Sequence, residues 1–127
     1  MTEDMGKAFA ATVADLSKQT SLRAVVLTGA GKAFSAGGDL KFLEDRAKTD
    51  IVSNEAIMHE FYERFLSLRD LPVPVIAALN GPAVGAGFAV SLACDMRIAA
   101  AGSKVGVNFA RLGITPGKRG HFGYRYP

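Results

Sequence analysis

Residues 24–43 read AVVLTGAGKAFSAGGDLKFL and carry the first unit of the fold. An apolar, valine-rich run over 22–27 ends at a Thr-Gly-Ala-Gly patch, which predicts a buried parallel strand leaving its sheet into a loop. A second turn-rich patch follows at 35–38. Asp39 stands directly after it, where its carboxylate is placed to cap a short helix through Phe42. The stretch therefore predicts a strand, a loop and a helix in that order.

Residues 72–99 follow the same order and read PVPVIAALNGPAVGAGFAVSLACDMRIA. The run over 73–79 predicts a second strand, because it is apolar and is bounded by prolines and by an Asn-Gly-Pro turn. A helix of small residues is expected over 85–94. Two shorter strands are expected at 96–100 and 105–107.

Two amphipathic helices are predicted beside these units. Thr2 is placed to cap the first, whose apolar positions recur at helical spacing at Met5, Phe9, Val13 and Leu16. The second is expected between Asp50 and Arg69, with an apolar face of Ile57, Met58, Phe61, Phe65 and Leu68. The alternation of helices and strands predicts an α/β fold with layered βα units, in which helices pack on a largely parallel sheet.

Charge and hydropathy exclude two classes of partner. The chain of 127 residues has a net charge of +3, but residues 118–127 hold three bases and no acid, so the first 117 residues are balanced. A short basic tail is a weak footprint for nucleic acid, and we expect no nucleic-acid partner. No apolar run approaches the roughly 20 residues of a bilayer span, so we expect no membrane span.

The single cysteine, Cys94, is expected to pack as a small hydrophobic residue. One cysteine cannot form a disulfide within the chain, and no metal site is predicted. The acidic start, MTEDMGKAF, is unlike a secretory signal. We therefore expect an intracellular protein, cytoplasmic or mitochondrial and not secreted.

Both predicted strand–loop–helix units carry glycines at the turn, and this geometry points backbone N–H groups at an anion or a developing oxyanion. Gly38 permits positive φ and the close approach of a substrate, and Gly85 and Gly87 do the same around Ala86. Neither loop has the glycine spacing of a dinucleotide-binding fingerprint, and neither has the Lys-Ser or Lys-Thr pair of a P-loop.

Taken together with VGVNFARLGITPG, residues 105–117, the two stretches resemble the enoyl-CoA hydratase/isomerase (crotonase) family. The resemblance covers most of the chain from Arg23 to Gly117. It implies a crotonase-like fold of an incomplete domain, truncated at both ends. On this interpretation residues 1–117 are a partial acyl-CoA-binding domain, and 118–127 form a basic and aromatic tail outside the family pattern.

The resemblance also implies a site. The backbone N–H groups of Gly38 and Ala86 would form an oxyanion hole for a thioester carbonyl, and Ala36, Gly38, Asp39 and Leu40 would lie in the region that receives the adenine of coenzyme A. A coenzyme A thioester would be the substrate, with no permanently bound cofactor. The family further implies a place in fatty-acid or related acyl-CoA metabolism and a homo-oligomer, a trimer or hexamer.

The chain departs from the hydratases of this family at two positions. Their two glutamates fall on Ala89 and Phe109, neither of which can transfer a proton. One hypothesis is an oxyanion-stabilising enzyme of the hydratase/isomerase type whose full-length parent is active. A second is a catalytically silent acyl-CoA-binding or interaction module. A third is a serine hydrolase with Ser35 as nucleophile and His59 or His121 as base.

Overall fold

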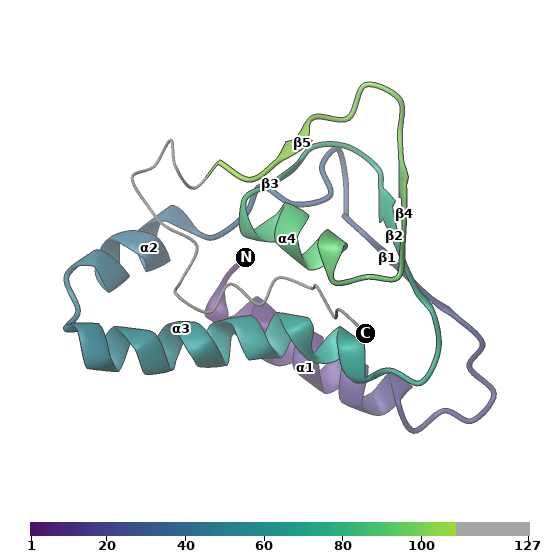
Figure 1. Cartoon of the computed structure of the whole chain (residues 1–127), viewed down its shortest axis with the longest axis horizontal. Helices are drawn as coiled ribbons and strands as arrows, with labels where there is room; N and C mark the ends of the chain where they lie inside the picture. The colour runs from purple at the N-terminus through teal and green to yellow at the C-terminus, as the bar shows by residue number, and fades with distance from the viewer. Residues whose placement is uncertain (109–127) are drawn as a thin grey trace, which may run out of the picture.

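The computed structural model describes residues 1–108 and comprises two small parallel sheets with helices against them (Figure 1). The larger sheet has the order β1-β2-β4, and the smaller pairs β3 with β5. The elements in chain order are α1 (Glu3–Leu16), β1 (Val25–Thr28), α2 (Leu40–Ala47), α3 (Ile51–Leu66), the 3₁₀ turn η1 (Ser67–Asp70), β2 (Val75–Leu79), β3 (Ala83–Val84), α4 (Ala86–Leu92), β4 (Met96–Ala99) and β5 (Val105–Gly106). This is the layered α/β arrangement that the sequence predicts.

Helices α1 and α3 lie side by side and form one layer, and α4 lies between that layer and the two sheets (Figure 1). Helix α1 begins at the predicted cap, where the Thr2 hydroxyl accepts the Met5 N–H at 3.2 Å. Helix α3 begins at Asp50, whose carboxylate accepts the Ser53 N–H at 2.9 Å. Within residues 1–108, none of the helices combines the length and the apolar character that a bilayer span requires.

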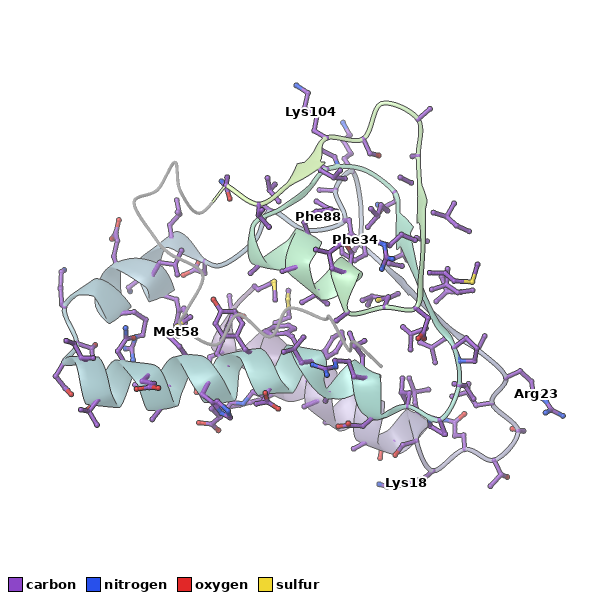
Figure 2. The ribbon with its side chains drawn as sticks, viewed as in Figure 1. Lys18, Arg23, Phe34, Met58, Phe88 and Lys104 are labelled. Atoms are coloured by element: carbon purple, nitrogen blue, oxygen red, sulfur yellow. The ribbon has the colours of Figure 1, made fainter. Side chains whose placement is uncertain are left out.

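The core forms where these helices meet the sheet. Phe9 of α1 and Phe65 of α3 contact each other with ring centroids 5.4 Å apart. Phe34, Met58 and Phe88 pack against this core, whereas Lys18, Arg23 and Lys104 are exposed at the edges of the molecule (Figure 2). The buried apolar side chains of the core include Val13, Phe61, Phe65, Leu68, Val75, Ala77, Leu79 and Val90.

The predicted apolar face of α1 holds at Val13, but Met5 is 53% exposed, because no described residue covers the first turn of the helix on that side. The predicted face of the second helix is confirmed, since Phe61 and Phe65 of α3 and Leu68 of η1 are each at most 3% exposed. The aromatic side chains of α3 therefore predicted the buried face correctly, whereas Met5 of α1 did not.

The strands of the larger sheet start later than predicted. Leu22 belongs to the turn after α1, where its N–H donates to the Gln19 carbonyl, and strand pairing begins when the Val25 N–H reaches the Pro74 carbonyl at 2.9 Å. Pro74 has no N–H to contribute, so β2 also begins one residue after it.

One face of the larger sheet is open. Register places Val26, Ile76 and Met96 side by side on the face opposite the core, followed by Thr28, Ala78 and Ile98. Val26, Met96 and Ile98 are 62%, 56% and 62% exposed. The prediction that the first strand is buried is therefore wrong for its outer face, because no element within residues 1–108 packs there. Parallel sheets are usually covered on both faces.

The side chain of Asn80 ties the two strand–loop units together at the carboxyl end of the sheet. Its Oδ1 accepts the Gly29 N–H at 3.1 Å and the Thr28 hydroxyl at 3.3 Å, and its Nδ2 donates to the Gly31 carbonyl at 2.9 Å. The neighbouring Gly81 lies so close to the Lys32 carbonyl that a Cβ would sit 2.1 Å from the oxygen. Asn80 thus fixes the path of the first loop across the second.

We expect Asn80→Ala to lower the free energy of unfolding by about 1–3 kcal/mol, because three hydrogen bonds between the loops are lost at once. Urea unfolding followed by circular dichroism measures this. Gln19→Ala, which also removes an exposed amide, is the matched control and should change stability by no more than about 0.5 kcal/mol. Equal effects of the two substitutions would contradict the role given to Asn80.

Cys94 is buried at 4% exposure, as predicted, and its Sγ lies 3.6 Å from the Val90 carbonyl oxygen. Burial raises the pKa of its thiol to about 11; the nearby Arg97 charge opposes this shift and Asp95 adds to it. The thiolate is therefore less favourable in the folded chain than in the unfolded one.

The sign of this pKa shift predicts the pH dependence. Because the folded pKa lies above the unfolded value, the contribution of Cys94 is fully present below about pH 9 and is lost as the pH rises through about 11. Cys94→Ala removes the titrating group, so stability of the wild type relative to this variant should fall over that interval by about 2 kcal/mol. Parallel pH profiles of the two chains in urea unfolding would contradict the prediction.

Candidate functional site

The two glycine-rich loops, about 50 residues apart in sequence, are in direct contact. The Val84 N–H donates to the Ser35 carbonyl at 3.0 Å, and Ser35 forms a parallel bridge with Ala83. Gly37 lies next to this pairing with a φ of +93°, and a Cβ on it would be 2.9 Å from the Val84 carbonyl oxygen and 3.6 Å from the Ala86 nitrogen. The backbone at Gly37 therefore approaches the start of α4 closely.

The two predicted donors lie next to this contact. Gly38 directly follows Gly37 in the first loop, and Ala86 lies two residues after Val84 in the second. Ala86 is the first residue of α4 and is 7% exposed, and Gly38 is half-buried. Among residues 1–108, no acceptor is hydrogen-bonded to the backbone N–H of either residue. The structure thus brings the loops of both candidate residues together with their N–H groups unused.

Positive φ, which Gly38 would permit, occurs at the neighbouring Gly37. Gly85 has the predicted unusual backbone, with φ +56° and ψ −128°, and its N–H donates to the Gly106 carbonyl at 2.9 Å. Gly87 does not adopt positive φ; it is required for packing, because a Cβ there would lie 2.3 Å from both Cβ and Oγ of Ser35. The structure uses the left-handed freedom at Gly37 and Gly85. Spacing alone does not distinguish a left-handed glycine from one that makes room for a neighbour.

The region predicted to receive adenine lies on the surface beside this contact. Ala36 and Leu40 are exposed, Leu40 by 69%. Asp39 caps α2, as predicted: its carboxylate accepts the Phe42 N–H at 2.9 Å. The backbone N–H of Asp39 donates to the Met1 carbonyl at 3.0 Å. Its carboxylate therefore has a structural partner.

Few titratable groups lie beside the two loops. The α-amino group of Met1 donates to the Gly37 carbonyl at 2.6 Å; burial lowers its pKa, and the Asp39 charge opposes that shift. His59 is exposed on α3, and Glu60 is paired with Arg64. Within residues 1–108 no histidine or carboxylate hydrogen-bonds to the 35–38 or 84–87 segments. The described part of the chain also contains no cluster of three or more His, Cys, Asp or Glu side chains that could hold a metal ion.

The family resemblance places the two hydratase glutamates at Ala89 and Phe109. Ala89 is 1% exposed, so its methyl group is enclosed within α4 and its neighbours. Phe109 lies outside the described residues, as does His121. Ser35 Oγ accepts the Gly37 N–H at 3.2 Å, and no histidine within residues 1–108 hydrogen-bonds to it. The described residues thus give Ser35 structural contacts and no histidine base of the kind that a hydrolase nucleophile needs.

Comparison with known proteins identifies the family. The family profile described as enoyl-CoA hydratase/isomerase matches residues 1–125. The chain belongs to the enoyl-CoA hydratase/isomerase family. It is 37% identical over 117 residues to the Mycobacterium tuberculosis protein named "Probable enoyl-CoA hydratase EchA14", a match that covers 92% of this chain and 44% of that protein.

Solved structures of the family have the same fold. The enoyl-CoA hydratase from Bacillus anthracis superposes with a TM-score of 0.79 at 36% identity, covering 92% of this chain and 45% of that one. DspI from Pseudomonas aeruginosa gives a TM-score of 0.80 at 34% identity, covering 91% and 44%. The chain therefore has the crotonase fold but spans less than half the length of the relatives it matches.

The sequence does not predict the contact between Ser35 and Gly87. A Ser-x-Gly-Gly turn in one loop and a Gly-x-Gly in another give no sign that they touch, since no local periodicity links them. The two-residue strand β3, whose Ala83 forms the bridge with Ser35, is too short for a pattern to predict.

Gly37→Ala should destabilise the chain more than Gly102→Ala. Both glycines have positive φ, +93° and +78°, so both substitutions carry the backbone cost of about 1–2 kcal/mol. A Cβ at Gly102 meets nothing within 4 Å, whereas at Gly37 it approaches the Val84 carbonyl oxygen at 2.9 Å. We expect the difference in unfolding free energy to exceed about 1 kcal/mol in urea titrations. A Gly37 variant as stable as the Gly102 variant would show that the loops are not tightly apposed.

Proposed function

We propose that this chain binds an acyl-CoA thioester and stabilises negative charge on its carbonyl oxygen through the backbone N–H groups of Gly38 and Ala86. The observation that carries the proposal is the direct contact of the two loops, with both N–H groups lacking an acceptor among the described residues. Two fixed backbone donors suit an oxygen on which charge develops during reaction. Each such donor contributes on the order of 10²–10³ in rate where charge forms.

Coenzyme A is the carrier group that we propose for the substrate, with no permanently bound cofactor. Ala36, Gly38, Asp39 and Leu40 form the proposed adenine region, and the exposure of Leu40 and Ala36 leaves an apolar surface open to a flat ring. The names of the relatives support this choice, since they are enoyl-CoA hydratases. We place the activity of a longer, complete protein in fatty-acid or related acyl-CoA metabolism, as a hydratase or isomerase.

A second candidate is a catalytically silent acyl-CoA-binding or interaction module. Ala89 favours it, because an alanine that is 1% exposed cannot supply the proton transfer that hydration of a double bond requires. Backbone donors without an acid or base still polarise a thioester carbonyl. The two candidates therefore share the binding step and differ in turnover.

Two further expectations belong to the proposal. We take residues 1–117 as the acyl-CoA-binding part, with 118–127 as a separate tail. We also retain a homo-oligomer, a trimer or hexamer in full-length members, and the exposed apolar side chains of Val26, Met96 and Ile98 support self-association.

Calorimetric titration of the whole chain with acetoacetyl-CoA, and separately with coenzyme A, tests the proposal. Tighter binding of the thioester is the expected result, because only the thioester presents a carbonyl oxygen to the two donors. Equal affinity, or no binding of either compound, would refute it. Incubation with an enoyl-CoA then distinguishes the candidates: loss or migration of the double bond indicates an enzyme, and binding without either change indicates a silent module.

Ala86→Pro removes one donor, because proline has no N–H and is tolerated at the first position of a helix. We expect this variant to lose about tenfold or more of the preference for acetoacetyl-CoA over coenzyme A, in line with the loss of one hydrogen bond to a charged oxygen. Ala86→Gly keeps the N–H and is the matched control, expected to retain the preference. Circular dichroism checks that both variants fold. An undiminished preference in the proline variant would exclude Ala86 as a donor.

A further inference from the structure

We propose that Ser35 is a positioning residue that sets the placement of the Gly38 and Ala86 N–H groups relative to each other. This inference rests on the proposed oxyanion function and adds a residue that touches neither substrate nor reacting atoms. Its basis is that one small side chain contacts both loops at the point where each delivers its donor.

The backbone of Ser35 is held on both sides by the second loop unit. Its N–H donates to the Pro82 carbonyl at 3.2 Å, and its carbonyl accepts the Val84 N–H at 3.0 Å. Through the bridge with Ala83, Ser35 is in effect an added strand residue beside β3. The position of Ser35 is therefore coupled to the chain two residues before Ala86.

The side chain of Ser35 holds the turn that leads to Gly38. Its Oγ accepts the Gly37 N–H at 3.2 Å, and Gly37 is buried with φ at +93°. A buried N–H without a partner is unfavourable, so this bond stabilises the left-handed conformation at Gly37. The direction of the next peptide, which carries the Gly38 N–H, depends on that conformation.

The same side chain contacts the first turn of α4. A Cβ on Gly87 would lie 2.3 Å from both Cβ and Oγ of Ser35, so the helix backbone rests against the serine with no side chain between them. Gly87 follows Ala86 directly. Ser35 thus contacts the residue before one proposed donor and the residue after the other.

The contacts of Ser35 Oγ fit a positioning role and not a nucleophilic one. The Oγ atom is bonded to a backbone N–H and packed against a helix backbone, and the described chain provides no histidine bonded to it. A hydroxyl held in this way can fix a turn. We therefore assign Ser35 to the support of the two donors.

Amide hydrogen exchange in the free chain tests the support directly. Ser35→Ala should raise exchange at Gly37 by about fivefold or more, because the hydrogen bond that protects this amide is lost. Ser91→Ala is the matched control: it removes a buried serine hydroxyl that donates to the Phe88 carbonyl within α4, and should leave the Gly37 amide unchanged. Unchanged exchange at Gly37 in the Ser35 variant would overturn the inference.

The ratio of affinities for acetoacetyl-CoA and coenzyme A tests the consequence. We expect Ser35→Ala to lower this ratio by about fivefold while coenzyme A affinity is retained, because misplaced donors affect the carbonyl oxygen alone. A preserved ratio would overturn the inference and leave the proposed function standing. A wild-type chain without thioester preference would overturn the proposed function, and this inference with it.

Two variants separate the hydrogen bond from packing and guard against a Ser35→Ala chain that does not fold. Ser35→Cys keeps a side chain of similar size against Gly87 with a weaker acceptor, and should lie between wild type and alanine. The double variant Ser35→Gly with Gly87→Ala relieves the overlap and refills the space without restoring an acceptor for Gly37. Its affinity ratio should stay low; recovery to the wild-type ratio would show that packing alone sets the donors.

Discussion

The site depends on one close approach, that of the Gly37 backbone to the carbonyl of Val84 and the nitrogen of Ala86. Two loops from distant parts of the chain can meet at this distance only where no Cβ lies between them and where the backbone can take positive φ. Gly37 satisfies both conditions, and Gly87 satisfies the first on the opposite side. Larger residues at either position would separate the loops and, with them, the two proposed backbone donors.

The rest of the described fold holds these loops in register. Parallel pairing of β1 with β2 places the ends of both strands at the same edge, so the loops that follow them start as neighbours. Asn80 then bonds the first loop at Gly29 and Gly31, and the Val75 N–H is held by the Asp95 carboxylate at 2.8 Å at the far end of β2. The helices α1 and α3 stabilise this arrangement by burying the inner face of the larger sheet, with Phe61 and Phe65 in the core.

The chemistry that this arrangement favours is polarisation by backbone groups. Amide donors keep the same charge at any ordinary pH and do not need a matched pKa, unlike a general acid or base. Membership of the enoyl-CoA hydratase/isomerase family agrees with such a site. The buried Ala89, at which the family resemblance places a hydratase glutamate, cannot transfer a proton, so binding and turnover require separate measurements.

The sequence by itself determined most of the elements and their order: the caps at Thr2 and Asp39, the aromatic face of α3 and the two strand–loop–helix units follow from local spacing and side-chain chemistry. Local pattern also pointed to both glycine loops and, through family resemblance, to Gly38 and Ala86. Only the tertiary structure decided that Gly37 takes the left-handed conformation, that Gly87 makes room for Ser35 and that one sheet face stays open in residues 1–108. These features arise from contacts between segments about 50 residues apart, and a periodicity that extends over a few residues cannot contain them.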